Sequence, residues 1–314
     1  MKDRLFLYGA VSHCYQRTHN HGVLFYSVRD HLVFFTIFCV NATRHNVRVL
    51  KLVQMPDHIH HASIANSKQE LSDFSRDCNS IFAKEYNRTH GLRGPVFETP
   101  FGSALKKSDK DIRSNLIYLD NNPVERKLVK KAEDYRWNFL AFANNPHPFS
   151  EKIVLRYASM PLRRSLKTVK RMHSQGRYLS YRFLDKLFGT LTSHLEREQL
   201  TDFIVSTYST IEYETATSYF SSYEQELIAA HATKGSEYDI NEVFIGKSDA
   251  IYARISKFLL SKNLCQDVHQ VLSWPIPEKL RLLEILRRET GAPIKQIAAY
   301  LHLPVGITDC PSHI

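Results

Sequence analysis

Two histidines one residue apart are the first side chains in this sequence that could do chemistry. They lie in residues 54–61, QMPDHIHH, just after a turn-forming Pro-Asp pair. Residues i and i+2 of a strand face the same side, so His58 and His60 present two imidazoles together while Ile59 turns into the core. Two imidazoles are a ready ligand pair for a divalent metal. The pair alone is weak evidence, because 16 histidines in 314 residues give roughly 0.8 such pairs by chance, and residues 19–21 form another.

A tyrosine and an asparagine on one face of a later helix are the second candidate group. Residues 112–124 read IRSNLIYLDNNPV, and Tyr118 and Asn122 are four residues apart, so they share a helix face. A tyrosine hydroxyl can act as a covalent nucleophile, and an amide oxygen beside it can complete a metal site. The alternative is that Tyr118, one of 16 tyrosines, packs in the core and that Asn122-Pro123 only ends the helix.

Taken together, these segments resemble the single-tyrosine HUH transposases, the insertion-sequence and REP-associated tyrosine transposases of bacteria. The order and spacing match over roughly residues 5–142: MPDHIH at 55–60, a capped helix, GPVF at 94–97 and YLDNNPVERKLV at 118–129. YRWN at 135–138 is similar to the family's Tyr-x-Trp-Ser stretch. The resemblance implies that His58 and His60 bind Mg²⁺ or Mn²⁺, that Tyr118 is the nucleophile, and that Asn122 is a third, amide-type ligand.

The resemblance implies a metal-dependent DNA transposase and nickase that cleaves and rejoins single-stranded hairpin DNA. A metal ion would act as a Lewis acid on the scissile phosphate, and attack by the tyrosine would leave a 5′-phosphotyrosine and a free 3′-hydroxyl. Imidazole ligands favour Mn²⁺ over Mg²⁺. Two alternatives stay open: a non-catalytic, domesticated nucleic-acid-binding protein on the same fold, and a relaxase-like or replication-initiator nickase. Monomer and homodimer also stay open.

Three features depart from the family pattern. Asp57 stands where Asn is usual before the first histidine. His61 replaces an apolar residue and should point to the opposite face of its strand. The tyrosine segment reads Leu-Asp-Asn-Asn-Pro-Val rather than Ile-x-Leu-Asn-Pro-Val. None of these differences removes a catalytic group.

The elements that must position these residues alternate between strand and helix patterns. Period-two and β-branched patterns predict strands at residues 5–17, 47–55, 58–65 and 96–105. Helical spacing and serine caps predict helices at residues 23–44, 68–90 and 109–122. The order β-α-β-β-α-β-α predicts an α+β fold: a ferredoxin-like antiparallel sheet with helices on one face and one helix added.

The rest of the chain reads as mainly helical. A turn-rich break at residues 144–148 marks a boundary between a catalytic domain at 1–145, a basic connecting segment at 146–190 and a helical region at 191–314. The predicted helices are 178–189, 197–207, 221–232, 247–260, 277–290 and 294–302. The last two, joined at Gly291, are similar to the opening of a helix-turn-helix. They are either a truncated DNA-binding module or a helical hairpin that packs or dimerises, because Pro311 interrupts the segment left for a recognition helix.

The charge of the chain favours a polyanionic partner. Its 42 basic and 32 acidic residues give a net charge of +10, although many basic proteins bind no nucleic acid. Residues 152–184 hold nine basic residues and no acidic one. This segment is either a solvated linker or a phosphate-tracking surface with aromatic stacking partners. The candidate DNA contacts are Arg163, Arg164, Lys167, Lys170, Arg171, Arg177 and Tyr178.

The remaining composition excludes several classes of protein. No window approaches 18 uncharged apolar residues, so we expect no transmembrane span. The five cysteines are scattered and lack a Cys-x-x-Cys pair, which is typical of reduced thiols in a cytosolic protein. We therefore expect a cytoplasmic, nucleoid-associated protein.

Overall fold

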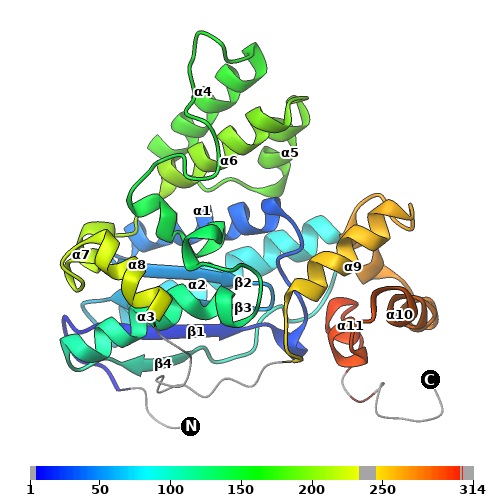
Figure 1. Ribbon diagram of the computed structural model, residues 1–314, viewed down its shortest axis with the longest axis horizontal. Coiled ribbons are helices and arrows are strands. Elements are labelled where there is room, and N and C mark those ends of the chain that lie inside the picture. Colours follow the sequence, from blue (N-terminus) through cyan, green and yellow to red (C-terminus); the bar gives the residue numbers. More distant parts are fainter. Residues whose placement is uncertain (1–4, 233–244, 305, 307–314) are drawn as a thin grey trace.

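The computed structural model describes residues 5–232, 245–304 and 306. At its centre is a four-stranded antiparallel sheet with the order β2-β3-β1-β4 (Figure 1). The strands are β1 (Ser12–Arg17), β2 (Arg48–Met55), β3 (His58–Ile64) and β4 (Gly102–Leu105). The first three α-helices are α1 (Val28–Arg44), α2 (Lys68–His90) and α3 (Asp109–Glu125). The predicted ferredoxin-like α+β fold is confirmed in both chain order and strand order.

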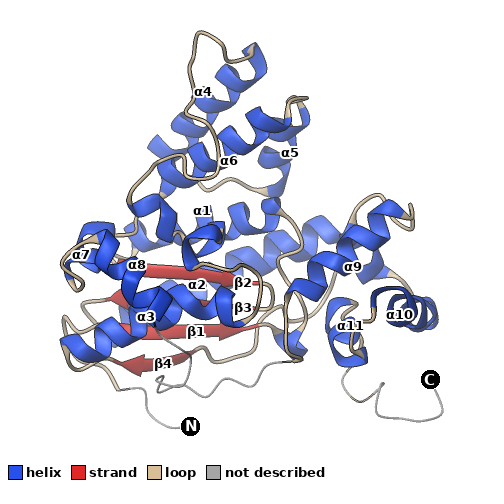
Figure 2. Cartoon of the chain, viewed as in Figure 1, coloured by secondary structure: helices blue, strands red, loops and turns tan. Residues whose placement is uncertain are grey.

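Helices cover both faces of this sheet (Figure 2). On one face, Phe38 of α1 and Phe74 of α2 share a buried cluster with Ile59 of β3. On the other face, Leu116 of α3 packs with Val53 of β2. The expectation that all helices lie on one face was wrong. β2 and β3 are buried almost throughout, so both of their faces need a helical cover, and the added helix α3 supplies the second.

Serine caps set where the three helices begin. The side chains of Ser27, Ser67 and Ser108 each accept a hydrogen bond from the backbone N–H three residues on. The first helix therefore starts at Val28 rather than at residue 23. The predicted end of α3 before Pro123 was also wrong, since the helix continues to Glu125. Pro123 lacks the N–H that would bond to the Leu119 carbonyl, but the turn that follows still closes, because the Arg126 N–H donates to the Asn122 carbonyl at 3.1 Å.

The described part of the chain after residue 144 is mainly helical, which confirms the predicted character of the C-terminal region. Helix α4, which falls within the expected connecting segment, and the short α7 were not predicted. The division into domains stays a prediction. The helices are α4 (Met160–Ser174), α5 (Tyr181–Gly189), α6 (His194–Tyr208), α7 (Tyr213–Ser218), α8 (Tyr223–Ala232), α9 (Ala250–Ser261), α10 (Ile276–Thr290) and α11 (Ile294–Tyr300).

These helices form three groups around the sheet (Figure 1). α5 and α6 pack on α1, on the side of α1 away from the sheet, and α4 packs on α6. α7 and α8 lie beside β2 and α3. α9, α10 and α11 pack together with a 3₁₀ helix, η6 (Val268–Ser273), that contacts α2. Most of the segment in which a recognition helix would fall lies outside the described residues.

Two further expectations from composition can be compared with the structure. Within the described residues, no helix combines the length and the apolar character that crossing a membrane requires. Cys14, Cys39, Cys78 and Cys265 are free thiols. Cys310 lies outside the described residues.

A histidine ties the end of α11 to the segment that precedes α1. His302 Nε2 donates to the Val23 carbonyl oxygen at 2.6 Å, and the Tyr26 hydroxyl donates to the Tyr300 carbonyl at 2.6 Å. Burial lowers the pKa of His302 to about 4. The positive charges of Lys279 on α10, His269 on η6 and His19 act in the same direction. His302 is therefore held in its neutral form.

Acidification is expected to weaken this attachment. The folded-state pKa of His302 lies below its unfolded value of 6.5. The stability that neutral His302 contributes is therefore fully present above pH 6.5 and is lost as the pH falls through about 4. Denaturant unfolding should show up to about 3 kcal/mol less stability at the lower pH from this group. His302→Gln keeps the donor to Val23 but does not titrate, so it should lose less stability over the same interval. An identical pH dependence in the variant would contradict this assignment.

Candidate functional site

The four residues of the predicted site lie together between β3 and α3. The rings of His58 and His60 are 4.9 Å apart between centroids. The Tyr118 ring is 5.7 Å from the His60 ring, and Asn122 Nδ2 is 3.5 Å from His60 Nε2. All four side chains are buried. Two rigid elements thus bring a nucleophile-type group beside three ligand-type groups.

The donor set fits a divalent cation. Asn122 is 1% exposed, and its Oδ1 has no hydrogen-bond partner among the described residues. The two amide atoms of an asparagine are interchangeable by a flip, so Oδ1 can take the place beside His60 Nε2. In that orientation the lone pairs of Asn122 Oδ1 and His60 Nε2 face each other, and a cation between the two atoms removes their repulsion. An amide oxygen suits Mg²⁺ or Mn²⁺, whereas imidazole nitrogens suit a transition metal, so of these two ions the set favours Mn²⁺.

A second layer of polar contacts orients the two histidines. His58 Nδ1 lies 2.6 Å from Asp57 Oδ1, and His60 Nδ1 lies 3.0 Å from His13 Nε2. Burial raises the pKa of Asp57, but the charge and hydrogen bond of His58 outweigh it and lower that pKa overall. An ionised Asp57 accepts the proton at Nδ1 of His58 and leaves Nε2 with a lone pair. Aspartate in place of the usual asparagine is therefore compatible with a ligand role for His58.

β1 adds two aromatic side chains that the sequence did not point to. The His13 ring lies 5.7 Å from the Tyr118 ring, and the Tyr15 ring lies 6.4 Å from the His60 ring. Both face α3 because they are two residues apart on one strand. Their alternation was visible in the sequence, but the register that places Tyr15 opposite His60 was not.

The third histidine of the run lies on the other face of the sheet. His61 packs against Phe38 and Phe74, with ring centroids 5.3 Å and 5.7 Å away. Burial and the charge of His60 lower the pKa of His61 to about 3. Its Nδ1 lies 2.8 Å from the Ser63 hydroxyl. His61 is thus a neutral core residue, separate from the candidate ligands.

The residues between Tyr118 and Asn122 anchor α3. Asp120 forms an ion pair with Lys51 of β2 at 2.8 Å, and Lys51 forms a second one with Glu226 of α8, also at 2.8 Å. The Asn121 amide donates to the Ala230 carbonyl at 2.7 Å. These buried contacts fix the rotation of α3 about its axis, and therefore the direction of Tyr118.

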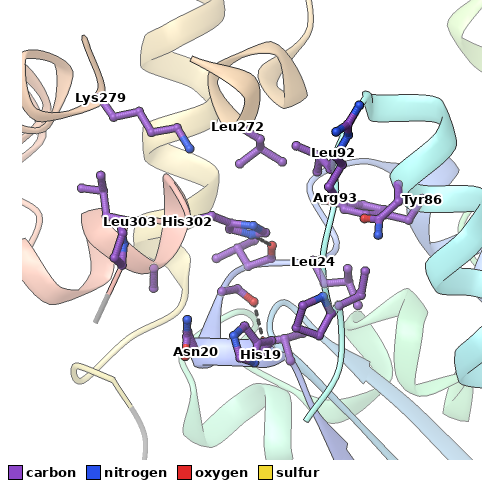
Figure 3. A pocket seen from close by; sticks show the side chains of 18 residues that line it. His19, Asn20, Leu24, Tyr86, Leu92, Arg93, Leu272, Lys279, His302 and Leu303 are labelled. Carbon is purple, nitrogen blue, oxygen red and sulfur yellow. Dashed lines mark hydrogen bonds between the residues drawn. The ribbon is translucent and has the colours of Figure 1, made fainter. Parts of the chain in front are cut away.

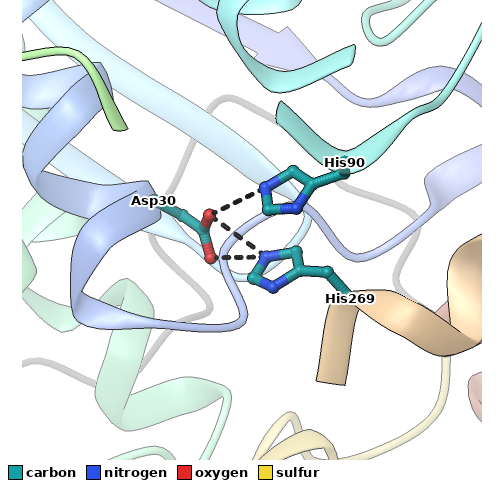
Figure 4. Close-up of side chains that lie close together, drawn as sticks. All are labelled: Asp30, His90 and His269. Carbon is teal, nitrogen blue, oxygen red and sulfur yellow. Dashed lines mark hydrogen bonds and ion pairs between the residues drawn. The ribbon is translucent and has the colours of Figure 1, made fainter. Parts of the chain in front are cut away.

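A separate group of ligand-type side chains lies at the start of α1 (Figure 4). Asp30, His90 and His269 place one ligand atom each within 4.8 Å of the others, and this buried group could hold a metal ion. The rings of the two histidines stack at 3.8 Å, and His269 also contacts Asp267 at 2.6 Å. Burial would lower the pKa of His269, but Asp30 and Asp267 raise it to about 9. A metal would compete with this proton. No sequence spacing links positions 30, 90 and 269.

The predicted DNA-contact residues lie elsewhere, on and just after α4. Leu162, Leu166 and Val169 form the buried face of this helix, and its basic side chains lie on the exposed face. The exposed basic residues are Arg163, Arg164, Lys167, Lys170, Arg171 and Arg177. Tyr178 is half-buried and donates to Glu85 at 3.3 Å. α6 and α1 separate α4 from the sheet, so the structure does not bring this set together with His60 and Tyr118 (Figure 1).

Comparison with known proteins adds little. No family model matches the chain, and no curated protein matches it either. The chain is similar to the solved structure of a REP-associated tyrosine transposase bound to a REP hairpin. That match has 18% sequence identity and a TM-score of 0.38, and it covers 44% of this chain and 80% of the other. A similarity this distant does not assign roles to the residues of the site.

Proposed function

We propose that this protein is a metal-dependent DNA transposase or nickase that cleaves and rejoins single-stranded hairpin DNA through a phosphotyrosine at Tyr118. The observation that supports this most is the contact of His60 with both Asn122 and Tyr118 across the gap between β3 and α3. A metal-ligand pair and a hydroxyl nucleophile are the parts that phosphodiester transfer needs. The cofactor is Mg²⁺ or Mn²⁺.

Each residue has a role that its contacts support. His58 and His60 would hold the ion through Nε2, and Asn122 would hold it through Oδ1. The bound ion would supply Lewis-acid stabilisation of the phosphate charge. The Tyr118 oxygen forms a bond to phosphorus, the bond from phosphorus to the 3′-oxygen breaks, and that oxygen leaves as a hydroxyl after the tyrosine proton reaches it through solvent. The phosphotyrosine keeps the bond energy, so the reverse step needs no ATP.

The basic face of α4 is the proposed surface for the rest of the DNA. Arg164, Lys167 and Arg171 are exposed, and such residues track phosphates without reading sequence. Arg163 is partly engaged, because its guanidinium donates to the carbonyls of Ala158 and Arg156. A hairpin held on α4 would reach the sheet around α1 and α6.

One observation favours a second candidate function. Tyr118 is only 4% exposed, so a DNA phosphate can reach its hydroxyl only if the neighbouring side chains move. A protein that binds nucleic acid without cutting it would need no such movement. Metal-dependent cleavage separates the two functions.

The metal requirement gives the first test. We expect labelled single-stranded hairpins to be cleaved with Mn²⁺ or Mg²⁺ and left intact with EDTA. His60→Gln should lower cleavage at least about 100-fold, because it removes a metal ligand at the reacting phosphate. His61→Gln changes the neighbouring residue on the opposite face and should keep cleavage near the wild-type rate. Equal losses in both variants, or cleavage in EDTA, would contradict the proposal. Tight binding with no cleavage under any condition would support the binding protein.

A further inference from the structure

A cavity of about 390 Å³ lies where the core meets the C-terminal helices (Figure 3). One wall comes from the segment after β1, from Thr18 to Leu24, and from the end of α2 with the loop that follows it. The other wall comes from η6, α10 and α11. Its volume is within the range of about 300–1,000 Å³ that small-ligand sites have. The cavity exists only because the C-terminal helices dock on the core.

A buried lysine with no counter-charge reaches into this cavity. Lys279 of α10 is 6% exposed, and no carboxylate or carbonyl of the described residues pairs with its Nζ. Figure 3 shows its ammonium reaching from α10 toward His302, along the wall that the C-terminal helices form. Burial lowers the pKa of Lys279. A buried cation without a partner is costly, and a bound anion would remove that cost.

The charged and titratable side chains of the lining are all basic apart from the Tyr86 phenol. His19 and Arg93 carry exposed basic groups in the lining, and none of the 18 described residues that line the cavity is an aspartate or a glutamate. The lining therefore suits an anion, because it contains basic side chains and no acidic one.

The apolar part of the lining suits an organic group attached to the anion. Leu24, Leu92, Leu272 and Leu303 line the same cavity as the cationic groups. Apolar walls with a few convergent polar groups are the usual composition of a site for a small organic ligand. A phosphate alone would leave these walls without a contact, whereas a sugar and base would cover them.

The cavity also adjoins the candidate site. Thr18, in its lining, donates its backbone N–H to the carbonyl of Asp57 at 3.1 Å, and Leu24 donates to Pro56 at 2.7 Å. Asp57 directly precedes His58. The cavity wall is therefore hydrogen-bonded to the segment that leads into His58, so the cavity lies beside the proposed position of the scissile phosphate.

We propose that this cavity binds a phosphate-bearing nucleoside unit, with the Lys279 ammonium facing the phosphate and the leucine walls facing the sugar and base. The unit is either a free mononucleotide or one nucleotide of a single DNA strand. If the ligand is one nucleotide of a DNA strand, this inference rests on the proposed function. If the ligand is a free mononucleotide, the inference does not depend on that function.

Calorimetric binding at fixed ionic strength tests the proposal. The protein carries Tyr118→Phe and is kept in EDTA, so cleavage cannot affect the result. The probes are thymidine 5′-monophosphate, thymidine and a short single-stranded thymidine oligonucleotide. We expect the monophosphate or the oligonucleotide to bind and thymidine to bind at least about tenfold more weakly, because it lacks the charged group. If the monophosphate binds, the ligand is a free nucleotide. If only the oligonucleotide binds, the ligand is one nucleotide of a strand.

Two variants decide whether Lys279 is responsible. Lys279→Met should weaken phosphate-dependent binding at least about tenfold, whereas Lys295→Met, the same change at an exposed position of α11, should alter it less than about twofold. Lys279→Met should melt no earlier than the wild type, since it removes an uncompensated buried charge. Arg93 is exposed, so Arg93→Gln tests the same cavity without risk to folding and should weaken binding by roughly two- to fivefold. Equal losses in the two lysine variants, no loss in either cavity variant, or equal binding of thymidine would overturn the proposal.

Discussion

Replacing Tyr118 by Phe is expected to abolish the covalent protein–DNA complex while leaving DNA binding nearly unchanged. The variant loses only the hydroxyl oxygen that would bond to phosphorus, and the ring that packs beside His13 and His60 is kept. Removing the nucleophile of a covalent mechanism lowers the rate by at least about a thousandfold. A denaturing gel with a labelled hairpin measures the complex, and anisotropy at matched salt measures binding.

Tyr15 supplies the matched control. Its ring lies 6.4 Å from that of His60, and it packs so closely over Gly102 that a Cβ there would lie within 2.4 Å of the Tyr15 ring. Tyr15→Phe removes a hydroxyl from the same face of the sheet, so it should keep the covalent complex. If Tyr15→Phe loses the complex and Tyr118→Phe retains it, Tyr15 rather than Tyr118 is the nucleophile.

Replacing Lys51 by Met is expected to lower the free energy of unfolding by about 3–5 kcal/mol, the usual effect of removing one partner from a buried ion pair. Lys51 is 4% exposed and lies between Asp120 and Glu226, 2.8 Å from each. Burial already raises the pKa of Asp120 to about 7, although Lys51 opposes that shift. Without the ammonium, two carboxyl groups would share a buried site. Urea unfolding followed by circular dichroism measures the loss.

Two further variants separate the charge effect from a packing effect. Lys51→Met combined with Glu226→Gln removes one of the opposed carboxylates and should recover about half of the loss. Lys110→Met, at an exposed position of α3, should change stability by less than about 0.5 kcal/mol. If Lys51→Met costs no more than the exposed variant, the ion pairs do not hold α3 in place.

The elements and contacts that were predictable depend on short sequence separations. Ser67 with Glu70 is a local signal, and the cap forms where the sequence placed it. The two-residue period put His58 and His60 on one face and His61 on the other, and the structure has this arrangement. The four-residue spacing of Tyr118 and Asn122 depends only on the geometry of one helix.

The features that were not predictable depend on long-range packing. Which face of the sheet α3 covers is decided by β2 and β3 being buried on both sides. The group of Asp30, His90 and His269 comes from three elements with no common spacing. Lys279 reads as an ordinary basic residue of an amphipathic helix until the docking of α10 buries it. Helix α4 was not predicted within the basic connecting segment, because its many basic residues mask the apolar stripe of Leu162, Leu166 and Val169 that packs it.

The central claim is that a phosphate becomes bonded to Tyr118, and peptide mapping of the trapped complex tests it most directly. Wild-type protein would be incubated with a hairpin pool and Mn²⁺, then digested with trypsin and nuclease and analysed by tandem mass spectrometry. The predicted result is a nucleotide on the peptide of residues 114–126, SNLIYLDNNPVER, in which Tyr118 is the only tyrosine. A nucleotide on any other residue, or DNA that is cut with no covalent peptide, would contradict the claim.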